Sequence, residues 1–163
     1  MFAIGVMGLL AACSNTSKEA ATYNDHIIDY QGDIIQAFNQ LDTLLKDSLA
    51  EKQQIDYAYV QLQATVKHGL LVIDSIGPFQ RDPIYQKATR DLFSAYDEIV
   101  AEDYDRFIDI ITLPDTLYGK AQQDSAILLR EKIRSDFDNA TNKFILAQEM
   151  FGKKYNIEFE PNP

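Results

Sequence analysis

The chain has 163 residues, of which 46% are hydrophobic and 25% are charged, values that are ordinary for one globular domain large enough to bury a core. Its formal net charge of −10 disfavours binding to nucleic-acid phosphates and to anionic lipid surfaces. It holds a single cysteine, so no internal disulfide can form.

Residues 1–12 form an uncharged apolar run. The run is too short to span a bilayer as a helix and has the length of a signal-peptide core, although the first two residues lack the Lys or Arg that usually opens one. The stretch from Leu10 to Cys13 reads Leu-Ala-Ala-Cys and resembles the lipobox of bacterial lipoproteins. The resemblance implies that residues 1–12 are a signal peptide and that Cys13 carries lipid. The alternative is an incidental or buried cysteine after an apolar start.

The next segment, 13–21, is polar and shows no periodicity, so we expect a lipidated cysteine followed by a flexible tether. Its lipid would supply the membrane contact that the acidic surface does not favour. Ser14 stands where aspartate would follow the cysteine, and by resemblance to lipoprotein sorting rules this favours the outer membrane. The expected location is therefore the outer membrane, facing either the periplasm or the cell surface.

The remaining chain shows helical periodicity in four segments, with apolar residues every three or four positions over 23–45, 55–73, 93–111 and 126–155. No segment alternates with period two for long enough to suggest a sheet. Short connections between consecutive helices make neighbours antiparallel. The sequence therefore predicts an all-α, up-down-up-down four-helix bundle over 22–157, followed by a C-terminal tail at 158–163.

Turn residues mark the expected helix ends. Gly77-Pro78 ends the second helix, and Asp82 followed by proline caps the third. Proline and aspartate at 114–115 end the third helix, and Gly119 lies just before the fourth. The first break has neither proline nor glycine, and we place it in the polar stretch 46–54.

Four stretches resemble a family of small helical surface lipoproteins known from Leptospira and Bacteroidota. They are Tyr23-Asn24-Asp25 followed by Ile28 and Gln31, Gly77-Pro78-Phe79, the run Leu92-Phe93 through Tyr96, and the run from Ala147 to Asn156. The resemblance implies lipidation, an envelope location and a helical fold. It implies no catalytic residue.

Catalytic and metal-binding motifs are missing from the sequence. Neither His26 nor His68 follows the Glu-x-x-His pattern of di-iron bundles, and there is no Gly-x-Ser-x-Gly elbow and no glycine-rich phosphate loop. One cofactor idea remains, in which His26 and Met150 lie at the same level of an antiparallel bundle and bind haem as axial ligands. The alternative is that both residues border the core, where methionine often fills gaps.

The third helix carries acidic residues that repel one another at i,i+4 spacing, and these are candidate contacts for a cation or a basic partner. They are Glu98, Glu102, Asp103, Asp105 and Asp109. The alternative is a solvated outer face. Phe79 in the 77–82 loop and Tyr57 off its apolar stripe are either exposed contact residues or packed against the bundle.

These observations predict a lipid-anchored, non-enzymatic binding or structural module of the cell envelope, without a bound cofactor. Its partners would be the membrane, through Cys13, and an envelope protein. The contact surfaces would be the acidic third helix and the 77–82 loop, presented away from the tether. The competing interpretation is a small-molecule or haem carrier that holds its ligand between the helices.

Overall fold

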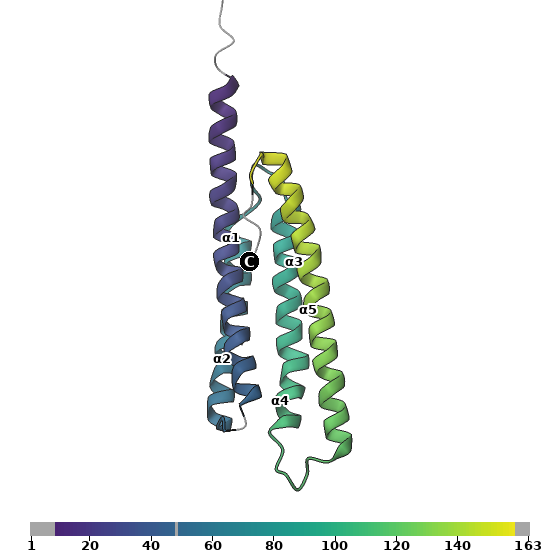
Figure 1. Ribbon diagram of the computed structural model, residues 1–163. Coiled ribbons are helices and arrows are strands. Elements are labelled where there is room, and N and C mark those ends of the chain that lie inside the picture. The colour runs from purple at the N-terminus through teal and green to yellow at the C-terminus, as the bar shows by residue number, and fades with distance from the viewer. Residues whose placement is uncertain (1–8, 48, 159–163) are drawn as a thin grey trace, which may run out of the picture.

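The computed structural model describes residues 9–47 and 49–158, and for residues 9–14 it gives the backbone only. Six helical elements follow one another: α1 (Leu9–Lys46), α2 (Lys52–Ile76), α3 (Ile84–Glu98), the π-helix η1 (Ile99–Tyr104), α4 (Asp105–Ile111) and α5 (Lys120–Tyr155). Because α3, η1 and α4 run on without a break, they form one bundle helix, and the architecture is a four-helix bundle (Figure 1). The predicted all-α bundle is confirmed.

Consecutive helices pack side by side, α1 against α2, α2 against α3 and α3 against α5 (Figure 1). Each helix contributes side chains to the shared core in the predicted periodic pattern. The fully buried positions include Ile27, Ile34, Leu41, Leu62, Val66, Ile73, Leu92, Phe93, Tyr96 and Phe144. Burying such side chains is the main term that favours folding.

The helix ends follow local capping chemistry. α2 begins after Glu51, whose backbone N–H donates to Gln54 Oε1 at 2.9 Å, and it ends before Gly77, which has a φ of 66°. The Asp82 carboxylate accepts the backbone N–H of Ile84 at 3.1 Å and so caps α3. Asn156 adopts the left-handed conformation and closes α5. The break expected at 46–54 is confirmed, because α1 ends at Lys46 and α2 begins at Lys52.

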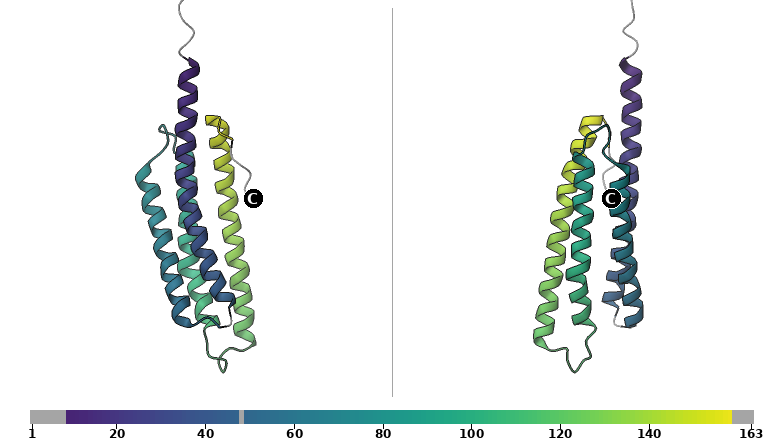
Figure 2. Two further views of the ribbon diagram at one scale, coloured as in Figure 1. Left: turned by 60° about the vertical axis from the view of Figure 1, so that its left-hand side comes forward. Right: turned by 180° about the vertical axis from the view of Figure 1, so that it is seen from behind.

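The segment expected to be a flexible tether, 13–21, is helical. α1 starts at Leu9, and its first turns project beyond the rest of the bundle (Figure 2). Ala20 is fully buried, and the Ser17 hydroxyl donates to the Asn156 carbonyl at 2.8 Å. Alanine, lysine and glutamate favour helix, and extending an existing helix needs no new nucleus. Residues 1–8, the Cys13 side chain and residues 159–163 lie outside the described part.

The third bundle helix also departs from expectation, because η1 replaces regular α-helix within it. A π-helix has a wider turn than an α-helix and often occurs at functional sites. Asp103 and Tyr104, the last two residues of η1, are both buried. Asp103 is 3% exposed and Tyr104 is 5% exposed.

Candidate functional site

Gln148 Nε2 donates to Asn24 Oδ1 at 2.9 Å across α1 and α5, and because these helices run antiparallel, His26 and Met150, each two residues further on, lie about one helical turn apart along the bundle. Both side chains are nevertheless at the surface. Met150 is 59% exposed, and the His26 ring lies against Tyr30, with 5.9 Å between ring centroids. The structure does not bring the two residues together in a buried site, because both fall outside the inward-facing stripes of their helices.

The acidic residues of the third bundle helix separate into two groups. Asp103 is buried and accepts a hydrogen bond from Lys132 Nζ at 2.6 Å. This ion pair joins the third bundle helix to α5. Hydrogen bonds to Asp103 first, and to Asp136 second, raise the pKa of Lys132. Asp105 accepts from the Tyr59 hydroxyl at 3.3 Å.

Glu98, Glu102 and Asp109 are exposed, as is Asp105. Among the described residues, no group of three or more His, Cys, Asp or Glu side chains is arranged to hold a metal ion. A contact between these exposed acids and a basic partner stays a prediction.

Phe79 is half-buried and packs in a ring cluster with Tyr23, Phe151 and Tyr155, at centroid distances of 5.4, 5.6 and 4.9 Å. The loop around it is fastened to α1, because the Tyr23 hydroxyl donates to the Gly77 carbonyl at 2.7 Å. The loop therefore lies beside the α1 segment that leads back to residue 13, and the expectation that it points away from the tether is wrong. Of the two candidate contact aromatics, only Tyr57 is well exposed, at 68%.

A groove lies between α1 and α5, and the third bundle helix forms its back wall. The helical periodicity of the sequence did not predict it. Its volume is about 410 Å³. The apolar and aromatic lining residues are Ile35, Phe38, Leu45, Tyr104, Phe107, Ile133 and Phe137. The polar and charged ones are Asn39, Asp42, Lys46, Arg130, Arg134 and Asp138. A concave apolar floor with a few polar groups is the usual composition of a small-molecule site.

Aromatic contacts fix the floor of this α1–α5 groove. The Phe38 ring meets Phe137 edge-on and lies beside Tyr104, with 5.6 Å between centroids in both pairs. The Tyr104 hydroxyl donates to Asp42 Oδ1 at 2.8 Å. Burial, reinforced by the negative charge of Asp42, raises the pKa of Tyr104, so its hydroxyl stays protonated and holds the carboxylate.

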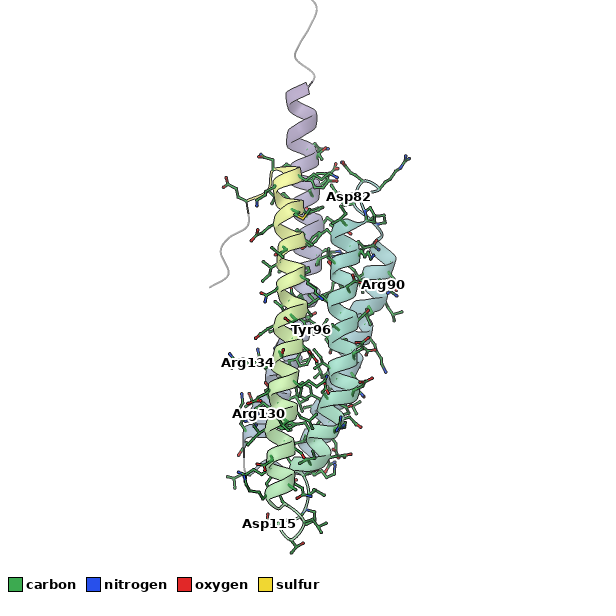
Figure 3. The ribbon with its side chains drawn as sticks, turned by 90° about the vertical axis from the view of Figure 1, so that its right-hand side faces the viewer. Asp82, Arg90, Tyr96, Asp115, Arg130 and Arg134 are labelled. Atoms are coloured by element: carbon green, nitrogen blue, oxygen red, sulfur yellow. The ribbon has the colours of Figure 1, made fainter. Side chains whose placement is uncertain are left out.

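The rim of the groove carries more positive than negative side chains, on a chain whose net charge is −10. Arg130 lies over the Phe107 ring, 5.4 Å from the centroid, and forms no ion pair among the described residues. Arg134 lies one turn further along α5 (Figure 3). It is only loosely paired with Asp138, at 3.9 Å. Because Arg130 and Arg134 are spaced i,i+4, they lie on the same side of α5.

A second, wider hollow of about 780 Å³ lies between α1 and α2. Its lining is mostly amide side chains, among them Gln36, Gln40 and Gln61, around the exposed Tyr57. It is more open to solvent than the α1–α5 groove, so the α1–α5 groove is the better candidate for a ligand site.

No protein-family model matches the chain, and neither a curated protein nor a solved structure shows significant similarity to it. The resemblance to the family of surface lipoproteins therefore stays a prediction. In the described part of the chain, no helix has both the length and the apolar character needed to cross a membrane.

Proposed function

We propose that this protein is a lipid-anchored, non-enzymatic binding protein of the bacterial cell envelope that holds a small ligand in the α1–α5 groove. The observation that carries the proposal is the groove itself, which lies between the first and last helices over an aromatic floor of buried Phe38 and Tyr104 and half-buried Phe137. A concave apolar surface with a few polar groups around it is typical of a ligand site. Of the two interpretations from the sequence, this favours the carrier over a purely structural module.

The groove also lies far from the expected anchor. On α1 it spans residues 35–46, which follow Cys13 on the same helix by 22 to 33 residues. At the rise of an α-helix this separation is roughly 33–50 Å. A lipid on Cys13 would leave the groove free of the membrane surface and accessible to a ligand in the surrounding space.

The ligand proposal is tested by native mass spectrometry of the Cys13→Ala protein purified from its own host, compared with a second variant that also carries Ile35→Trp. Ile35 is a half-buried lining residue, and an indole there would fill the groove. The matched control is Gln36→Trp, which puts the same side chain in the α1–α2 hollow. We expect bound mass in the Cys13→Ala and Gln36→Trp proteins and none in the Ile35→Trp protein.

Bound mass that persists with Ile35→Trp, or a Cys13→Ala protein without any, would contradict the proposed groove. If Ile35→Trp fails to fold, Asp138→Trp blocks the groove from an exposed position instead. The anchor is tested separately, by fractionation of the host. The native chain should stay with the membrane after a salt wash and Cys13→Ala should not, and a variant still bound to the membrane would contradict the anchor.

A further inference from the structure

We infer that the ligand of the α1–α5 groove is a single-chain amphiphile with a carboxylate head, of the fatty-acid class. The inference rests on the proposed function and adds the chemistry of the ligand. Its basis is the arrangement of the lining residues: Lys46 and Arg130 lie toward one end, and apolar side chains run along the whole groove.

The positive end is formed where the end of α1 meets the first half of α5. Because α1 and α5 run antiparallel, Lys46 and Arg130 lie toward this end and Ile35 and Phe137 toward the opposite one. Arg130 is oriented by the Phe107 ring and retains its donors for an anion. A guanidinium offers a planar fork that matches a carboxylate.

The one acid near this end, Asp42, is already engaged. Its Oδ1 accepts from the Tyr104 hydroxyl at 2.8 Å. Its single negative charge offsets only part of the positive charge of Lys46 and Arg130. Asp138, the other acid of the lining, lies toward the opposite end, next to Arg134. The arrangement disfavours a cationic head, which would meet Lys46 and Arg130 at this end.

The rest of the groove suits an alkyl chain rather than a compact polar molecule. It follows α1 from Ile35 to Lys46, which corresponds to about 16 Å along the helix axis. The side chains on this path, among them Phe38, Leu45 and Ile133, offer an apolar surface and few hydrogen-bonding groups. An extended chain buries its methylene groups there, and each buried methylene favours binding.

The test is calorimetric titration of the full-length Cys13→Ala protein with three twelve-carbon probes: dodecanoate, dodecanol and dodecylammonium. We expect dodecanoate to bind with one-to-one stoichiometry and at least tenfold more tightly than the other two. The substitutions Lys46→Gln and Arg130→Gln together should weaken dodecanoate about tenfold or more and leave dodecanol unchanged, since they remove charge-assisted contacts to the head. The matched control is Lys143→Gln, an exposed α5 cation outside the groove, which should change neither affinity.

Two results would overturn the inference. Equal affinity for dodecanoate and dodecanol, both lost with Ile35→Trp, would show that the groove binds apolar chains without selecting a carboxylate, and the proposed function would stand. Absence of binding by all three probes would overturn the ligand class, whereas the proposed function would still be judged by the mass carried by protein from the host.

Discussion

The two ends of the bundle are built from the same kinds of side chain and are closed to different degrees. At the aromatic end, defined by Tyr23, Phe79, Tyr85, Phe151 and Tyr155, the rings contact one another at centroid distances of 4.7–6.4 Å and a loop packs over them. At the groove end, defined by the lining residues of the α1–α5 groove, similar rings line a hollow of about 410 Å³.

The two ends differ in the contacts that connect α1 to α5. At the aromatic end, buried Asn24 accepts from both the Tyr85 hydroxyl and Gln148, at 2.8 and 2.9 Å, and connects three helices. At the groove end, Phe107 belongs to a second, smaller apolar cluster with Ala126 and Leu129, separate from the main core. We interpret the aromatic end as the source of stability, which leaves the groove end free to bind.

The largest expected effect is on stability at the aromatic end. Tyr85 is 2% exposed and stacks on Phe151, so Tyr85→Ala should cost about 3–5 kcal/mol of unfolding free energy through the cavity it leaves. Phe137→Ala removes a half-buried groove ring and should cost about half as much. Urea denaturation measures both values, and equal losses would contradict the comparison.

A smaller loss is expected from the polar connection at the aromatic end. Asn24→Ala leaves the Tyr85 hydroxyl and the Gln148 amide without their shared acceptor, and should cost about 1–3 kcal/mol. The exposed Asn39, on the same helix at the groove end, is the matched control, and Asn39→Ala should change stability by less than about 0.5 kcal/mol. Similar values for the two variants would mean that the connection contributes nothing particular.

Substitutions at two glycines test how tightly the middle of the bundle is packed, because Gly69 is buried there and Gly32 is at the surface. A Cβ on Gly32 would meet no atom within 4 Å, so Gly32→Ala should stabilise its helix by about 0.5–1 kcal/mol. A Cβ on Gly69 would lie 3.0 Å from Ile34 Cδ1 and 3.2 Å from Phe93 Cδ2, and both side chains are fully buried. The free energy of unfolding of Gly69→Ala, measured by thermal denaturation, should therefore be at least about 1 kcal/mol lower than that of Gly32→Ala. A stabilising Gly69→Ala would show that the middle is loosely packed.

The smallest expected effect is a pH dependence at the aromatic end. The hydrogen bond from Lys154, at 2.6 Å, and that from the Ile84 N–H hold the pKa of Asp82 below its usual value of 3.8. A lowered pKa in the folded state adds stability above the unfolded value, and this is lost as the pH falls through the folded value. Asp82→Asn keeps the helix cap, and its melting temperature should fall below the native one at pH 7. The difference in melting temperature between the two proteins should disappear in acid. A difference that does not change with pH would contradict a contribution of the ion pair to stability.

The fold could be predicted from the sequence because periodicity reports which side chains face inward, and because glycine, proline and capping residues mark helix ends. The periodicity assigned Phe38, Phe107 and Phe137 to the core, but it could not show that these residues border a groove. That depends on the distance between α1 and α5, the first and last helices, which no short connection fixes. The only local signal was a pair of arginines, Arg130 and Arg134, on either side of Ile133 on a face expected to be apolar.

Two other features were hidden for similar reasons. Helical structure over 13–21 depends on elongation from the packed part of α1 and on the distant contact between Ser17 and Asn156. Within η1, Asp103 and Tyr104 pair with Lys132 and Asp42, which lie on other helices. A local sequence pattern contains neither kind of information.

The most direct test of the central claim is hydrogen–deuterium exchange of the Cys13→Ala protein, with and without saturating dodecanoate. We expect slower exchange on binding in residues 35–46 and 130–138, no change in residues 20–27 and 144–152, and no response at all in the Ile35→Trp variant. Protection centred on the α1–α2 hollow around Tyr57, or spread evenly over both ends, would contradict the claim that the α1–α5 groove is the binding site.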